Sequence, residues 1–225
     1  MEIVVADDAA HCAAARIAYR LRDAVRRRGS ASLALSGGST APPMIAALVA
    51  DSVPWPAVTV WQVDERVAPD GHEARNAGQL APFDGLGCIV RPMPVTARDL
   101  RAAARRYGAA VPERLDVVHL GVGDDGHTAS WPPGVPEVAS SERTVETVGS
   151  FNGWARMTLT ARVVNGARSR VVLATGRSKR PMIERWLLDD PDIPVSAVRR
   201  RSTWVFVDPP AAPANAPVTP VRTRQ

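Results

Sequence analysis

Short apolar runs alternate along the chain with longer stretches in which apolar residues recur every three or four positions. The short runs are typical of strands buried in a sheet, and the longer stretches are typical of amphipathic helices. This alternation predicts an α/β fold in which a parallel sheet is covered by helices on both faces. The expected strands are Ile3–Val5, Ser32–Leu35, Val58–Val63, Gly87–Val90, Asp116–Leu120, Thr144–Val148, Met157–Thr160, Arg170–Ala174 and Thr203–Val207.

Capping residues and prolines mark where the expected helices begin. Asp7 or Asp8 can accept hydrogen bonds from the first turn of a helix that ends near Arg28, and Thr96 can do the same for a later helix. Pro42 and Pro43 are tolerated in a first helical turn. The expected helices cover residues 9–28, 44–50, 76–80, 97–110 and 161–167, and one more extends from Lys179 to about Leu188.

The composition fits one soluble domain. Of the 225 residues, 45% are hydrophobic and 23% are charged, which is sufficient for a buried core. We expect a single domain over residues 1–207. From Asp208 onward there are five prolines and no aromatic residue, so residues 208–225 are expected to form a Pro-rich, disordered tail.

The termini and cysteines bear on location. No segment approaches 18 consecutive apolar residues, so no membrane span is expected, and the acidic N-terminus lacks the basic region of a signal peptide. Cys12 and Cys88 have no metal-ligand spacing and cannot make a disulfide framework. We therefore expect a cytoplasmic protein, a monomer or weak homodimer, that does not contact membranes.

The basic residues are almost all arginine. The net charge is +5, and of the 28 basic residues 27 are Arg and one, Lys179, is Lys. We interpret this skew as codon usage, and the runs Arg26–Arg28 and Arg199–Arg201 as solvated surface, so no nucleic-acid partner is expected. In such a chain a lone lysine indicates a position that requires a compact, flexible ammonium.

Four polar loops follow expected strands, at residues 36–40, 64–66, 121–128 and 176–179. In an open parallel sheet ligands bind at the carboxyl ends of the strands, so these loops should converge on one site. The first loop, Ser36-Gly37-Gly38-Ser39-Thr40, can bind an anion through its backbone N–H groups, its hydroxyls and the start of the following helix. No Gly-Lys-Ser/Thr follows, which disfavours ATP.

The segment Gly121–Gly126 matches the dinucleotide pattern G-x-G-x-x-G, but we reject that interpretation. His127-Thr-Ala-Ser-Trp-Pro-Pro does not begin a helix, and Asp124 and Asp125 would repel a pyrophosphate. The turn instead presents one imidazole beside carboxylates, as a general base requires. His11 is expected at the surface, His72 in a polar loop and His119 in the core with its hydrogen bonds satisfied. A metal site is not indicated.

Four segments together resemble the successive signatures of the 6-phosphogluconolactonase family, over about residues 30–185. They are Leu35-Ser-Gly-Gly-Ser-Thr40, Val63-Asp-Glu-Arg-Val67, Leu120-Gly-Val-Gly-Asp-Asp-Gly-His-Thr-Ala-Ser130, and Thr158-Leu-Thr160 with Asn165-Gly-Ala167 and Thr175-Gly-Arg-Ser-Lys179. The resemblance implies a Rossmann-like, three-layer α/β/α fold. It also implies hydrolysis of 6-phosphoglucono-δ-lactone to 6-phosphogluconate in the pentose phosphate pathway, without metal or cofactor.

The resemblance and the loops suggest roles for ten residues. His127, backed by Asp125 or Asp64, would activate a water molecule. The substrate would be bound by Ser36, Gly37, Gly38, Ser39, Thr40, Arg66 and Lys179. Two departures from the family pattern, Trp131-Pro132-Pro133 and Arg75, bear on how the substrate is positioned.

Three rival functions are weighed against the same residues. A non-catalytic sugar-phosphate sensor would share this rim, but it is normally fused to a helix-turn-helix domain, for which 225 residues leave no room. A nicotinamide-dependent oxidoreductase rests only on the G-x-G-x-x-G match. A glucosamine-6-phosphate deaminase would need a Glu where this chain has Trp131-Pro132-Pro133.

Overall fold

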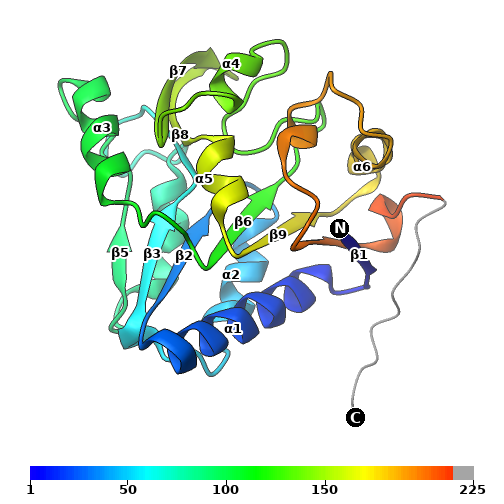
Figure 1. The fold of residues 1–225 in the computed structure, drawn as a ribbon, viewed down its shortest axis with the longest axis horizontal. Coiled ribbons are helices and arrows are strands. Elements are labelled where there is room, and N and C mark those ends of the chain that lie inside the picture. The colour runs from blue at the N-terminus through cyan, green and yellow to red at the C-terminus, as the bar shows by residue number, and fades with distance from the viewer. Residues whose placement is uncertain (215–225) are drawn as a thin grey trace.

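The centre of the molecule is a sheet of seven parallel strands in a computed structural model that describes residues 1–214 (Figure 1). Neighbouring strands follow the order β1-β10-β9-β6-β2-β3-β5. They are β1 (Glu2–Val5), β2 (Ala31–Leu35), β3 (Val58–Gln62), β5 (Ile89–Arg91), β6 (Val117–Gly121), β9 (Ser169–Ala174) and β10 (Thr203–Val207). Each overlaps an expected apolar run, so the predicted parallel sheet is confirmed.

A second, smaller sheet is antiparallel. It consists of β4 (Asp64–Arg66), β8 (Trp154–Leu159) and β7 (Val145–Phe151), in that order. Sequence analysis expected two of these strands but assigned Asp64–Arg66 to a loop. The structure pairs Asp64 with Thr158 and Arg66 with Arg156, so this part of the prediction is wrong. The three polar residues of β4 do not alternate with apolar ones. They form a strand because they pair with β8, which is distant in the sequence.

Helices cover both faces of the central sheet, which gives the expected three-layer α/β/α arrangement, Rossmann-like in its parallel sheet (Figure 1). They are α1 (Ala9–Arg28), α2 (Ala41–Val49), α3 (Leu100–Ala110), α4 (Pro136–Ala139), α5 (Ala161–Gly166) and α6 (Arg180–Leu187). One core joins α1 and α2 to the sheet, and the other joins the remaining helices and the small sheet. Among residues 1–214 no helix has the length and apolarity needed to cross a membrane.

The strand order creates a crevice between β2 and β6. From β2 the chain proceeds to β3 and β5 at one edge of the sheet, whereas from β6 it proceeds to β9 and β10 towards the other. Connections that leave neighbouring strands in opposite directions leave a gap at the carboxyl ends of those strands. The loops Ser36–Thr40 and Gly121–His127 begin at this gap.

Two element boundaries differ from the expected ones. Asp99, not Thr96, caps α3, and its carboxylate accepts a hydrogen bond of 2.8 Å from the Ala102 N–H. The ordered chain also extends past Val207, because Asp208 accepts from the Gly176 N–H at 2.9 Å and Ala211 is buried. Residues 208–214 are therefore not part of a disordered tail, and the rest of the expected tail, residues 215–225, lies outside the described residues.

His119 lies in the core, but its hydrogen bonds are not satisfied as expected. The residue is fully buried on β6, and neither ring nitrogen has a hydrogen-bond partner among residues 1–214. Burial lowers the pKa of His119 to about 4, because a charged ring would lose its hydration. Below the ordinary histidine pKa of 6.5 the unfolded chain therefore binds a proton that the folded chain does not.

Replacing His119 by leucine should stabilise the protein, and more strongly in acid. At pH 7 the gain should be about 1 kcal/mol, because two unpaired ring nitrogens leave the core. As the pH falls from 6.5 to 4 the gain should grow by about 3 kcal/mol, since the wild type alone loses stability through this histidine. Urea unfolding of both proteins at pH 8 and pH 4 checks this. An equal gain at both pH values would contradict it.

Candidate active site

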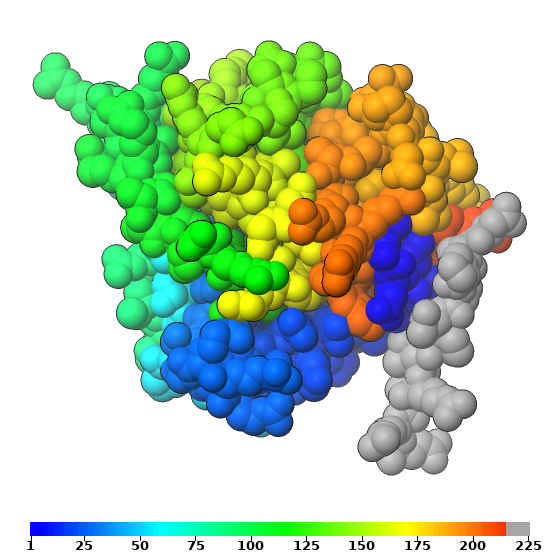
Figure 2. All heavy atoms as spheres, in the orientation of Figure 1, coloured from blue at the N-terminus to red at the C-terminus, as the bar shows by residue number. Residues whose placement is uncertain are grey.

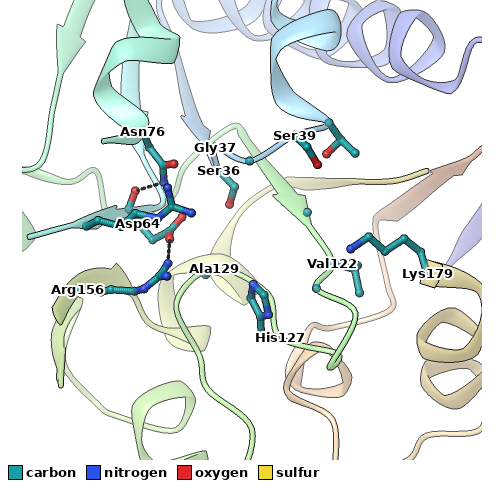
Figure 3. Close-up of a pocket in the computed structure, with 15 residues that line it drawn as sticks. Ser36, Gly37, Ser39, Asp64, Asn76, Val122, His127, Ala129, Arg156 and Lys179 are labelled. Carbon is teal, nitrogen blue, oxygen red and sulfur yellow. Dashed lines mark hydrogen bonds and ion pairs between the residues drawn. The ribbon is translucent and has the colours of Figure 1, made fainter. Parts of the chain in front are cut away.

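A polar pocket of about 190 Å³ lies at the carboxyl ends of β2, β3, β6 and β9, beside β4 and β8 of the small sheet (Figure 3). All four polar loops contribute to its wall, so the expected convergence is confirmed. The predicted site residues that line it are Ser36, Gly37, Gly38, Ser39, Thr40, Asp64, Arg66, His127 and Lys179. Asp125 does not line the pocket and reaches it only through His127. Asn76 and Arg156, which sequence analysis did not assign to the site, complete the lining.

The Ser36–Thr40 loop connects β2 directly to the N-terminus of α2. Gly37 packs so closely against Asn76 that a Cβ atom there would lie 2.2 Å from the Asn76 Oδ1. Only glycine therefore permits this approach. The Ser36 Oγ and the Asn76 Oδ1 are buried and have no hydrogen-bond partner among residues 1–214, although both residues line the pocket. Unpaired buried polar atoms at a pocket wall are suited to bind ligand hydroxyl groups.

His127 and Asp125 form a hydrogen-bonded pair at the end of β6. The His127 Nδ1 lies 2.5 Å from an Asp125 carboxylate oxygen, which also accepts from the His127 backbone N–H at 3.1 Å. Gly123 makes room for the pair, because a Cβ atom there would lie 2.0 Å from the His127 Nδ1. Burial alone would raise the pKa of Asp125, but the hydrogen bonds from His127 lower it below its ordinary value. An ionised Asp125 holds the proton on Nδ1 and leaves Nε2 unprotonated.

Asp64 is buried and does not contact His127 through a hydrogen bond. Its carboxylate accepts from the Ser130 Oγ at 2.7 Å and lies 3.9 Å from the Arg156 guanidinium (Figure 3). Burial raises the pKa of Asp64, and the Ser130 hydroxyl and the two nearby arginines oppose that rise. Of the two carboxylates expected to back His127, the structure therefore pairs the imidazole with Asp125.

Glu65 places Asn76 at the pocket wall. This carboxylate is fully buried and accepts from the backbone N–H groups of Asn76 at 2.7 Å and Ala77 at 2.8 Å. The same carboxylate accepts a hydrogen bond from the Gln62 side-chain amide at 2.9 Å and forms an ion pair of 3.1 Å with the Arg75 guanidinium. With these bonds Glu65 fixes the start of the 3₁₀ helix Asn76–Phe83 against β4.

Lys179 lies on the opposite side of the pocket from Asn76 and Arg156, on the same side as Ser39 (Figure 3). It precedes α6, and its ammonium forms an ion pair of 2.6 Å with Asp124. The Lys179 hydrogen bond lowers the pKa of Asp124. A cation at the start of a helix is unfavourable, and a bound anion would compensate for it. The structure adds Asp124 as a second compensating charge.

Both departures from the family pattern lie outside the pocket wall. Trp131 is fully buried, and its indole N–H donates to the Leu159 carbonyl at 2.8 Å. Arg75 is buried between Glu65 and Asp70. Trp131 therefore packs in the core. Arg75 affects the site only indirectly, through its ion pair with Glu65.

The arrangement offers an anion site and a base, but no evident metal site. Residues 1–214 contain no cluster of three or more His, Cys, Asp or Glu side chains that could hold a metal ion. The chain after Gly126 forms no helix until α4 begins at Pro136, as expected when the dinucleotide interpretation was rejected. The features in place are a loop of glycines and hydroxyl side chains at the start of α2 and an imidazole–carboxylate pair.

Comparison with known proteins agrees with this geometry. The family model described as glucosamine-6-phosphate isomerases/6-phosphogluconolactonase matches residues 5–207. The chain belongs to this family. A 6-phosphogluconolactonase from Synechocystis sp. is 34% identical over 178 residues, which cover 72% of this chain and 74% of that protein. One from Streptomyces coelicolor is 34% identical over 227 residues, covering 88% and 87%.

Solved structures support the same assignment. The crystal structure of a 6-phosphogluconolactonase from Shewanella baltica has a TM-score of 0.83 and 25% identity, and it covers 92% of this chain and 96% of that chain. The resemblance seen in the sequence motifs and the Rossmann-like α/β fold are both confirmed.

Proposed function

We propose that the protein hydrolyses 6-phosphoglucono-δ-lactone to 6-phosphogluconate in the oxidative branch of the pentose phosphate pathway. The observation that carries the proposal is the His127–Asp125 pair, which shares one pocket with the anion-binding Ser36–Thr40 loop. Membership of the family supports it, because the relatives above are 6-phosphogluconolactonases. No rival function has a comparable feature in the pocket.

The phosphate of the substrate would bind at the start of α2. The backbone N–H groups of Gly37 and Gly38 and the hydroxyls of Ser39 and Thr40 are donors there, and the helix N-terminus adds a partial positive charge. The Lys179 ammonium faces the same side of the pocket. The sugar hydroxyls would then lie towards the unpaired polar atoms of Ser36 and Asn76 and near the Arg66 guanidinium.

His127 would act as the general base through Nε2. The nitrogen takes a proton from water while the water oxygen attacks the lactone carbonyl carbon, and the carbonyl oxygen becomes an oxyanion. When the tetrahedral intermediate collapses, the bond from C1 to the ring oxygen breaks. The proton on Nε2 then passes to the ring oxygen, which becomes a hydroxyl. Asp125 keeps Nδ1 protonated throughout and stabilises the transient imidazolium.

Arg156 is better placed than the glycine turn to stabilise the oxyanion. The Gly123 and Gly126 N–H groups already donate within the turn, to the His127 carbonyl at 2.7 Å and to the Gly123 carbonyl at 3.1 Å. Arg156 is buried, lines the pocket and is oriented by Asp64. A guanidinium in this water-poor position interacts strongly with a developing negative charge. Asp64 would therefore position Arg156 rather than His127.

An assay on three substrates tests the proposal. Purified protein should hydrolyse 6-phosphoglucono-δ-lactone well above the spontaneous rate, hydrolyse unphosphorylated gluconolactone poorly, and leave glucosamine 6-phosphate unchanged. Lactone loss followed at constant pH, with a protein-free blank, measures this. Deamination of glucosamine 6-phosphate, or no acceleration of lactone hydrolysis, would contradict the proposal.

A further inference from the structure

A second polar pocket lies at the opposite end of the central sheet from the candidate active site. It has a volume of about 300 Å³ and is formed where α1 ends and where β6 and β9 begin. Figure 2 shows these three segments meeting on the surface, α1 in blue, the segment before β6 in green and the segment before β9 in yellow. Only charged residues line this arginine pocket: Arg20, Asp23, Arg27, Arg28, Arg114, Asp116 and Arg168.

The two carboxylates of the arginine pocket already form ion pairs with neighbouring arginines. Asp116 is buried, and it accepts from the Ser32 N–H at 2.9 Å and from Arg28 at 2.5 Å, with Arg168 3.3 Å away. Asp23 pairs with Arg27 at 2.9 Å and with the neighbouring Arg26 at 2.6 Å. The carboxylates thus hold three of the lining guanidinium groups in fixed places.

Arg20 and Arg114 remain without a carboxylate. Neither side chain forms a salt bridge or a hydrogen bond with any other part of residues 1–214. With five arginines and two aspartates, the arginine pocket carries an excess of three positive charges. The C-terminal end of α1 offsets part of this repulsion, since its dipole is negative there. Like charges held around a concave surface favour an anion that can contact several of them at once.

We propose that the arginine pocket binds a small molecule through a diphosphate or triphosphate group. A single phosphate ester carries only about −1.5 to −2 at neutral pH, so one such group would leave part of the excess charge uncompensated. Guanidinium groups bind phosphate oxygens in pairs of parallel hydrogen bonds, and of the five that line the pocket, those of Arg20 and Arg114 have no carboxylate partner. The volume lies at the lower end of the range for small-molecule sites and is too small for an extended polymer groove. This inference does not depend on the proposed function.

Calorimetric titration with inorganic pyrophosphate and with ADP tests the proposal. The decisive variant is Arg20→Gln/Arg114→Gln, which leaves every salt bridge of the pocket intact. It should weaken pyrophosphate binding at least about tenfold, because two charge-assisted contacts are lost. The control Arg101→Gln/Arg105→Gln removes the same charge from exposed positions on α3 and should bind like the wild type. Equal affinity for pyrophosphate and ADP would show that the pocket contacts only the diphosphate group. Tighter binding of ADP would show that the pocket also contacts the nucleoside.

The Lys179→Ala variant separates this site from the candidate active site. If Lys179→Ala abolishes pyrophosphate binding and Arg20→Gln/Arg114→Gln does not, the anion binds only in the active site and the proposal is wrong. Equal weakening in the α3 control would show a diffuse charge effect and would also overturn it. The same holds if the wild type binds a short DNA duplex through Arg20 and Arg114 but binds neither pyrophosphate nor ADP.

Discussion

Replacing His127 by alanine should lower kcat on 6-phosphoglucono-δ-lactone by at least about 100-fold and leave KM nearly unchanged. A general base acts in the transition state, whereas the groups that bind the phosphate lie elsewhere in the pocket. The imidazole is the only one that lines the pocket among residues 1–214, so no other histidine can replace it. Steady-state kinetics, corrected for spontaneous lactone hydrolysis, measure both constants.

His11→Ala is the matched control, because His11 is exposed on α1 and should leave kcat unchanged. In the wild type, burial would raise the pKa of Asp125, but hydrogen bonds from His127 lower it, so the carboxylate stays ionised and orients the imidazole. A His127→Ala variant that keeps more than about a tenth of the wild-type kcat would remove His127 from the mechanism.

The position of the site could be predicted from the sequence because it follows from a rule for parallel sheets. Once the runs Ser32–Leu35 and Asp116–Leu120 are assigned as strands, the Ser36–Thr40 loop and His127 must lie at the same edge. The choice of His127 over three other histidines required only its Gly-rich, strand-end setting. Each of these steps uses local sequence and one general property of the fold.

Asn76 and Arg156 could not be found in this way. Asn76 reaches the pocket because the buried Glu65 carboxylate accepts a hydrogen bond from its backbone N–H. Arg156 reaches the pocket because its strand, β8, pairs with β4, which lies 90 residues away in the chain. Both placements depend on tertiary contacts that leave no periodic signal. The predicted start of the tail at Asp208 was wrong for the same reason. The hydrogen bond from the Gly176 N–H to Asp208 joins residues far apart in the sequence, and composition gives no sign of it. The Asp64–Arg66 strand likewise has no signal in the local sequence, because only its pairing with β8 makes it a strand.

Replacing Lys179 by alanine should raise KM for the phosphorylated lactone by about 10- to 100-fold, the effect of one charge-assisted hydrogen bond. Lys179 is the single lysine of the chain, and its ammonium lies at the pocket wall on the same side as Ser39. The kcat at saturation should change little, because the phosphate is remote from the carbonyl that reacts. Lys179→Arg should restore binding only in part, since a planar guanidinium is wider than an ammonium.

The ion pair between Lys179 and Asp124 provides the control for stability. The Asp124 side chain is 68% exposed, so water can solvate its carboxylate when the lysine is removed. The free energy of unfolding should therefore change by less than about 1 kcal/mol, and a loss of binding in Lys179→Ala would not reflect unfolding. The phosphate assignment is checked with unphosphorylated gluconolactone, whose KM should be insensitive to the substitution. If both lactones lose affinity equally, or neither does, Lys179 serves only to hold Asp124, and the phosphate binds at another cation of the pocket wall, such as Arg66.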